Sequence, residues 1–264
     1  MLRKDALAGA NTANATLDAA EVARFDERSR EWWDPNGKFR VIHAFNAVRR
    51  DYVIEAIASR RRRDPRSARA LEGLRLLDIG CGAGVLAEPL ARRGAEIVGI
   101  DASSASIDAA RRHAEAGGLK IDYRHCLAAD LLDAGETFDV VLNTEVVEHV
   151  ADQDRFLRES AALTAPGGLH LMATLNRTAK AWLFAIVGAE YVVGWLPKRT
   201  HAWSKFVRPA EARAVLAGAG LSEIETLGVG YDLLRRRWRI LGDASVNYMM
   251  LSERPLAPGM LPNA

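Results

Sequence analysis

Residues 74–101 read LRLLDIGCGAGVLAEPLARRGAEIVGID and decide the fold. A hydrophobic run ends at Asp78, a glycine-rich turn and a segment of helical length follow, and a second apolar run, 97–100, ends at Asp101. This order predicts a strand, a turn, a helix and a second strand, with a carboxylate closing each strand.

The turn is suited to hold a nucleoside-bearing ligand over the carboxyl ends of parallel strands. Gly80, Gly82 and Gly84 permit a tight turn and a close approach to the main chain, where a Cβ atom would interfere. Asp101, about twenty residues beyond the glycines, is placed to accept hydrogen bonds from two ribose hydroxyls. These features fit both NAD and S-adenosylmethionine.

The spacing of the glycines separates the two ligands. A dinucleotide site reads G-x-G-x-x-G, because its third glycine lets a helix pack close while its N-terminus faces a pyrophosphate. Here the pattern is G-x-G-x-G, and Val85 and Leu86 occupy the next two places. Asp78 would repel a pyrophosphate, but it suits a ligand that carries an ammonium and a sulfonium. The stretch therefore favours S-adenosylmethionine.

Length and composition indicate one large α/β core in a reducing compartment. The chain has 264 residues and a net charge of only +2, so no overall field argues for nucleic acid. Arginines cluster at 60–69 and at 235–239, which indicates either solvated surface or an anionic partner. Cys81 and Cys126 give no disulfide framework. No apolar run is long enough to span a bilayer, so we expect a soluble or peripheral protein of the cytoplasm.

The N-terminal part is expected to be helical after a flexible tail at residues 1–17. Helices are predicted at about 18–33 and 41–59, and these N-terminal helices (18–60) either cover the mouth of the sheet as a lid or simply pack on it. Residues 18–264 are expected to form a single domain, whose cofactor-binding core is 74–175 and whose C-terminal helix and strands lie at 207–252.

The rest of the chain predicts a mostly parallel, seven-stranded, Rossmann-like sheet with helices on both faces. Asp130 follows the third strand and is either a partner for an adenine amino group or a helix cap. After the two strands of the opening unit, the strands are expected at 121–124, 138–143, 169–174, 221–227 and 246–251, with helices at about 103–116 and 153–163.

A polar cluster follows the fourth predicted strand. If the segment is helical, Glu145, Glu148 and His149 stand at i, i+3 and i+4 and share one face. Two carboxylates and one imidazole suit a hard divalent cation, with Mg²⁺ as the first choice. Two alternatives stay open: His149 as a general base without a metal, and a purely structural role.

Residues 178–206 form an apolar insert between the fifth strand and the next helix. Within 181–206, tryptophans are spread along an interrupted apolar run that ends in cations. Tryptophans beside cations favour an anionic membrane surface, while a buried helix on the substrate side is the alternative. The residues that carry this pattern are Trp182, Trp195, Trp203, Lys198, Arg199 and Lys205.

The motifs together resemble a known family. The glycine loop, the acid after the second strand and Pro-Gly-Gly at 166–168 resemble class I S-adenosylmethionine-dependent methyltransferases. Over about residues 20–252 the chain resembles the UbiG family of ubiquinone-biosynthesis O-methyltransferases. The segments that carry this resemblance are SREWWDPNGKF (29–39), the spaced His43, Asn46 and Arg49, TEVVEHV (144–150), TLNRTAKAWLFAIVGAEYVVGWLPKRTH (174–201) and VNYMM (246–250).

The resemblance implies methyl transfer from S-adenosylmethionine to a ring hydroxyl of a polyprenylated catechol-type intermediate, at two stages of one pathway. It places cofactor contacts on Arg49, Gly80, Asp101 and Thr144, with Arg49 gripping the cofactor's carboxylate, and it supports Mg²⁺. Thr144 stands where larger residues are common in the family, so a main-chain contact is expected there. Peripheral attachment to the inner membrane and a ubiquinone-biosynthesis complex are further expectations.

Overall fold

The computed structural model describes residues 16–18, 20–23, 32–33, 40–183, 203–232, 235 and 237–256, with the backbone alone at 40–42. Most of the predicted tail and of the first predicted helix lies outside these residues, as does most of the apolar insert. Thr16 is nevertheless buried, and its carbonyl oxygen accepts a hydrogen bond from Ala151 N at 3.2 Å. Residues 16 and 17, which the sequence assigns to the tail, are thus among those that the structure describes.

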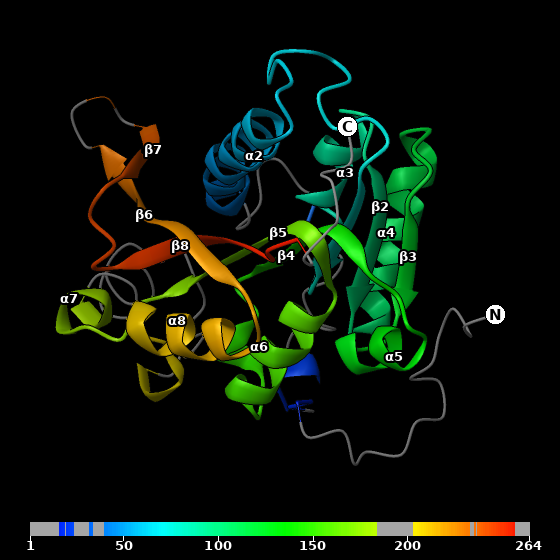
Figure 1. The fold of residues 1–264 in the computed structure, drawn as a ribbon. Coiled ribbons are helices and arrows are strands. Elements are labelled where there is room, and N and C mark those ends of the chain that lie inside the picture. The colour runs from blue at the N-terminus through cyan, green and yellow to red at the C-terminus, as the bar shows by residue number, and fades with distance from the viewer. Residues whose placement is uncertain are drawn as a thin grey trace.

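The described residues form one eight-stranded sheet in the order β3-β2-β1-β4-β5-β8-β6-β7 (Figure 1). The strands from β3 to β5 run parallel, β8 runs antiparallel to both β5 and β6, and β7 runs antiparallel to β6. The strands are β1 (Arg75–Ile79), β2 (Glu96–Asp101), β3 (Asp122–His125), β4 (Phe138–Thr144), β5 (Thr164–Leu175), β6 (Ser222–Asp232), β7 (Arg237–Leu241) and β8 (Asn247–Glu253).

The prediction of seven strands was wrong by one, because β7 lies within an arginine cluster. Trp238 and Ile240 alternate with arginines, and they pack beside Phe45 and Val229 in a small apolar cluster. Trp238 and Phe45 meet edge to face, with ring centroids 5.0 Å apart. The outward arginines hid a strand that is apolar on one face only.

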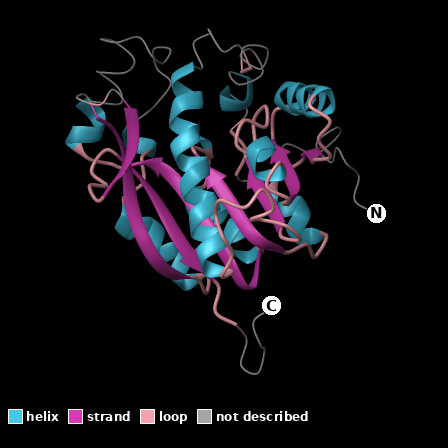
Figure 2. Ribbon diagram, turned by 90° about the horizontal axis from the view of Figure 1, so that it is seen from above, coloured by secondary structure: helices cyan, strands magenta, loops and turns pink. Residues whose placement is uncertain are grey.

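Helices cover both faces of the sheet (Figure 2). Two large clusters of buried apolar side chains, one on each face, contain residues from the helices and strands that they join. One face carries α2 (Arg40–Arg60), α3 (Ala87–Ala91) and α4 (Ser104–Ala116), and the other carries α5 (Ala128–Asp133), α6 (Gln153–Ala162) and α8 (Pro209–Gly218). Within the described parts of the chain, no helix combines the length and the apolarity that crossing a membrane requires.

The helix α2 packs on the sheet rather than standing over it. Val53, Ile54 and Ile57 are buried in the core of that face, which is the packing alternative for the helix predicted at 41–59. Arg49, one turn earlier, is also buried and lies near the end of β4. One helix thus serves the core with its second half and the site with its first.

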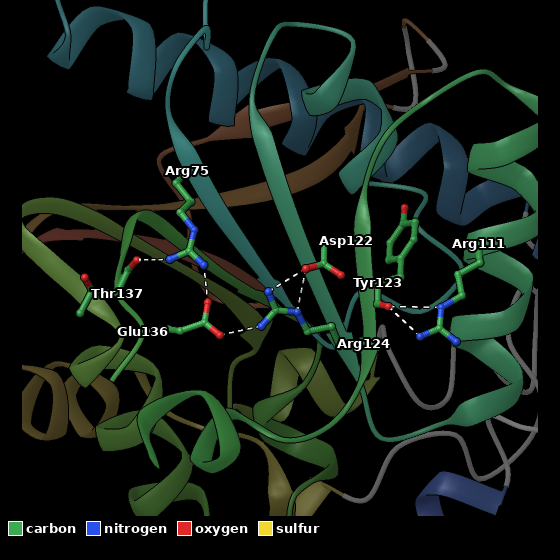
Figure 3. A network of polar contacts seen from close by, with 7 residues as sticks. All are labelled: Arg75, Arg111, Asp122, Tyr123, Arg124, Glu136 and Thr137. Carbon is green, nitrogen blue, oxygen red and sulfur yellow. Dashed lines mark hydrogen bonds and ion pairs between the residues drawn. The ribbon is translucent and has the colours of Figure 1, made fainter. Parts of the chain in front are cut away.

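A network of polar contacts connects β3, β1 and the loop before β4 (Figure 3). Arg124 on β3 donates to Asp122 at 2.7 Å and to Glu136 at 2.6 Å. Glu136, in the loop before β4, also binds Arg75 of β1. The shared Glu136 carboxylate bridges two guanidinium groups and fixes the loop that leads into β4.

Candidate active site

The predicted glycine loop is present between β1 and α3. Its backbone is left-handed at Gly80, Gly82 and Gly84, with φ of +69°, +52° and +85°. Residues other than glycine rarely adopt such angles. The main-chain N–H groups of Gly80 and Cys81 donate to Ile100 O at 2.8 and 3.0 Å, which anchors the loop to the end of β2.

Tyr123 lies beneath this loop and leaves no room for a larger residue. A Cβ atom on Gly84 would lie 2.9 Å from Tyr123 Cζ and closer still to its hydroxyl. Arg111 of α4 holds the strand in place by donating from Nη2 to Tyr123 O at 2.9 Å (Figure 3). The loop is therefore shaped from below by a ring that the sequence analysis did not single out.

Two tryptophans of the N-terminal segment contact the glycine loop. Trp33 Nε1 donates to Ala83 O at 2.9 Å. A Cβ atom on Gly82 would lie 3.6 Å from the Trp32 ring, so that ring is in contact distance of the loop. Trp33 also stacks on His113 of α4, with centroids 3.5 Å apart. Trp32 and Trp33, at the end of the first predicted helix, therefore lie on the glycine loop.

Two carboxylates, from the ends of β1 and β2, flank the loop. Asp101 accepts hydrogen bonds from Gly82 N at 2.9 Å and Ser103 N at 2.8 Å. Asp78 is buried, and its Oδ2 has no hydrogen-bond partner among the described residues. Burial, together with the charge of Asp101, raises the pKa of Asp78 to about 7. A buried carboxyl group with a free oxygen fits a ligand that brings a positive charge.

Two other predicted contacts have structural positions of their own. Asp130 Oδ2 accepts from Leu127 N at 2.7 Å, so the helix-cap alternative is the one found, at the start of α5. Thr144 ends β4 and is paired with Ala173 of β5. The sheet thus fixes the position of the Thr144 main chain, through which the ligand contact is expected.

The segment after β4 is not the α-helix on which the shared face depended. Glu145 has a φ of +57°, and its N–H donates to Ala173 O at 2.8 Å. Only the 3₁₀ helix η2 (Val147–His149) follows. The left-handed residue turns the chain sharply at the strand end, so Glu145 does not belong to the helix that carries Glu148 and His149.

The three predicted side chains accordingly reach different partners. Glu145 binds Arg49, while Glu148 Oε2 accepts from the Thr174 hydroxyl at 2.8 Å. His149 Nδ1 lies 2.9 Å from Glu21 Oε2. Among the described residues, no three acidic, histidine or cysteine side chains are grouped to hold a metal ion.

The two glutamates nevertheless remain neighbours. Burial and the nearby charge of Glu145 raise the pKa of Glu148 well above its usual range. Glu148 Oε1 is buried and has no hydrogen-bond partner in the described part of the chain. The carboxylates of Glu145 and Glu148, with one unpartnered oxygen, fit a cation. The His149 imidazole lies beside Glu21 instead.

Arg49 joins the acidic cluster to α2. Its side chain is 3% exposed, Nη1 donates to Asn46 Oδ1 at 3.3 Å, and Cζ lies 3.9 Å from the centre of the Phe45 ring. Nε has no hydrogen-bond partner among the described residues. The buried guanidinium thus keeps one N–H donor that the described residues do not use.

Sequence reasoning missed Glu21, Thr174 and Tyr123. Thr174 lies at the end of β5 beside β4, so adjacency of strand ends was an available signal. Glu21 contacts His149, which lies 128 residues later in the sequence, and no local sequence pattern predicts such a contact.

Comparisons with known proteins show which proteins the chain is similar to. A family model described as a methyltransferase domain matches residues 77–172. The chain is 55% identical to the ubiquinone biosynthesis O-methyltransferase of Mesorhizobium japonicum, over 91% of this chain and 96% of that protein. It is 53% identical to the protein of the same name from Chelativorans sp., over 93% and 97%.

Solved structures share the fold at lower identity. Magnesium protoporphyrin IX methyltransferase from Synechocystis PCC 6803, crystallised with bound SAM, superimposes with a TM-score of 0.59 at 20% identity, covering 92% of this chain and all of that one. A possible histamine N-methyltransferase from Thermotoga maritima gives a TM-score of 0.59 at 16% identity, covering 89% and 98%. These likenesses confirm the Rossmann-like methyltransferase fold.

Proposed function

The chain belongs to the family of ubiquinone biosynthesis O-methyltransferases, and on that premise we propose that it methylates a ring hydroxyl of polyprenylated catechol-type intermediates with S-adenosylmethionine, at both O-methylation steps. The observation that carries the proposal is the glycine loop with its buried Asp78, which meets the glutamate segment after β4 where Val146 packs on Gly80. A site for a cationic nucleoside thus borders a site for a polar acceptor.

Four residues would each bind one part of S-adenosylmethionine. Asp101 would accept hydrogen bonds from the ribose hydroxyls, Asp78 would bind the ammonium and Arg49 the carboxylate. Thr144 would contact the cofactor through its main chain. S-adenosylmethionine, when bound, supplies an electrophilic methyl group on a sulfonium. Close alignment of this methyl group with the acceptor oxygen provides much of the acceleration, and no covalent enzyme intermediate is required.

On the acceptor side, we propose that Glu145 and Glu148 hold Mg²⁺. When bound, a divalent cation acts as a Lewis acid that eases loss of the phenolic proton. We propose that His149, predicted as a third ligand, acts as a general base instead, because the Glu21 carboxylate 2.9 Å from Nδ1 favours one tautomer of its imidazole. Glu21 would then orient the imidazole, and the two glutamates would carry the cation.

One assay tests donor, acceptor and metal together. The protein is incubated with labelled S-adenosylmethionine and a short-tailed catechol analogue after chelation, across a Mg²⁺ titration. We expect transfer that depends on Mg²⁺ and is lost in Glu148→Gln, whereas Glu55→Gln, the same change at an exposed position of α2, keeps it. Metal-indifferent activity in Glu148→Gln would rule out the cation site.

The same assay distinguishes the alternative functions. Transfer to a different phenol or to a lipid headgroup, with none to the catechol, would assign another acceptor. Donor binding without any transfer would favour a non-catalytic S-adenosylmethionine-binding subunit of a ubiquinone-biosynthesis complex. Such a complex is also our proposal for where the enzyme works.

We further propose that the insert docks on anionic membrane, so that the polyprenyl tail stays in lipid while the ring enters the site. In support, Trp182, Leu183 and Trp203 at the described ends of the insert are 47%, 50% and 41% exposed. Exposed tryptophans beside cations suit the headgroup region. The wild-type protein should co-sediment with anionic liposomes, and deletion of 182–196 should abolish this. Tyr231→Ala, at an exposed aromatic on β6, should not; equal binding of the deletion variant would refute the proposal.

A further inference from the structure

A buried arginine and a left-handed glutamate meet where the donor and acceptor parts of the site adjoin. Arg49 of α2 donates from Nη2 to Glu145, and the two side chains are 3% and 30% exposed. The φ of +57° at Glu145 costs free energy that surrounding contacts must supply. The ion pair with Arg49 is one contact that holds Glu145 in this conformation.

Glu145 lies between the glycine loop and Glu148. The next residue, Val146, packs on Gly80 so closely that an added Cβ would lie 3.4 Å from Cγ1 and closer to Cγ2. On the other side Glu148 is buried with an unpartnered oxygen, in the part of the chain that the structure describes. Movement of one carboxylate therefore changes both the donor loop's surroundings and the acidic pair.

The charges at this point allow one anion at a time. A guanidinium carries a single positive charge, and Glu145 already neutralises it. A second carboxylate arriving at Arg49 would place two anions on one cation, with Glu148 adding a third acidic group nearby. The neutral partner Asn46, 3.3 Å from Nη1, does not compensate for an additional negative charge.

We propose that Glu145 is an internal competitor for Arg49, which it occupies until the carboxylate of the methyl donor displaces it. This inference rests on the proposed function, which assigns Arg49 to that carboxylate. One charge-assisted hydrogen bond replaces another, and no proton or electron is transferred. The displaced Glu145 keeps Glu148 as its neighbour, so that occupation of the donor site frees the acidic pair on the acceptor side.

Calorimetry with two ligands tests the exchange without measuring activity. S-adenosylhomocysteine carries the amino-acid carboxylate, whereas 5′-methylthioadenosine has a methyl group in place of the whole amino-acid chain, and so lacks both its carboxylate and its ammonium. Removing the competitor in Glu145→Gln should tighten S-adenosylhomocysteine binding by about ten- to a hundredfold, since a hydrogen bond to a charged group no longer has to be broken. Binding of methylthioadenosine should stay within about twofold. Glu55→Gln should change neither affinity.

The outcomes separate this inference from the proposed function. Unchanged or weaker binding of S-adenosylhomocysteine by Glu145→Gln would overturn the competition, because the pair would then be a fixed support. Failure of the wild-type protein to bind either ligand would overturn the donor site itself. Retained binding of methylthioadenosine reports that a variant is folded. If Glu145→Gln loses it, Glu145→Asp, whose shorter side chain retracts from Arg49, carries the same expectation.

Discussion

Replacing Gly84 by alanine isolates the contact that shapes the donor loop. The left-handed backbone, with φ of +85°, costs an alanine about 1–2 kcal/mol. The new Cβ would also lie 2.9 Å from Tyr123 Cζ, and overpacking of this kind costs a further 1–3 kcal/mol, roughly. We expect Gly84→Ala to lower the free energy of unfolding by about 2–5 kcal/mol, a large part of the stability of a typical domain.

Gly135 provides a matched control for the backbone term. It has a φ of +69°, and an added Cβ would meet nothing within 4 Å, so Gly135→Ala should cost only about 1–2 kcal/mol. The unfolding free energy of each variant is measured by urea denaturation, and donor affinity by titration with S-adenosylhomocysteine. Gly84→Ala should weaken donor binding, whereas Gly135→Ala should leave it unchanged.

A double-mutant cycle with Tyr123 tests the steric term directly. The Tyr123 hydroxyl is buried and has no hydrogen-bond partner among the described residues, so Tyr123→Phe alone should be close to neutral. Combined with Gly84→Ala it removes the nearest atom and should restore about 1 kcal/mol or more. Equal costs for the two alanines, or no coupling with Tyr123→Phe, would refute the packing argument.

Three other predictions concern protons and charges. Asp78, with a pKa near 7, is mostly neutral at pH 6 and charged at pH 8. As the pH is raised toward 7, the affinity for S-adenosylhomocysteine measured by calorimetry should increase by up to about tenfold per pH unit. Asp78→Asn should lose this dependence. Burial, and next the charge of Arg254, lower the pKa of His170 to about 3 from 6.5. The unfolded chain therefore takes up the proton first, and stability should be full above pH 6.5 and fall by about 1.4 kcal/mol per pH unit down to about 3, a slope that His170→Gln should flatten in urea titrations. Glu136→Gln should cost about 1–2 kcal/mol because Arg75 and Arg124 share its carboxylate, whereas Glu72→Gln, in an exposed pair with Arg69, should cost under about 0.5; equal costs would contradict the network's role.

The sequence was informative wherever a local pattern carried the structure. The glycine loop and both strand-ending acids lie as expected, because the turn, the strands and their carboxylates fall within 28 consecutive residues, 74–101. All seven predicted strands are present, since each is apolar on the face that it buries. The family resemblance is confirmed by relatives that match over almost the whole chain.

The parts of the site that the sequence did not predict depend on one backbone angle or on contacts between distant residues. The left-handed turn at Glu145 is invisible in composition, and it separates a glutamate from the helix that should have aligned it. Glu21 reaches His149 only because the N-terminal segment folds back over the site. Arg49 has a partner, Glu145, that follows from the packing of α2 against the end of β4.

The placement of β8 has a consequence for the order in which the molecule is completed. β6 and β7 are joined to the rest of the sheet only through β8, which lies between β5 and β6. Until residues 247–253 have been synthesised, β5 keeps an open edge and β6 lacks its neighbour. Unpaired edges invite pairing with other chains. A nascent polypeptide of this protein is therefore most vulnerable to aggregation late in translation, when its donor loop can already fold but its sheet has not yet closed.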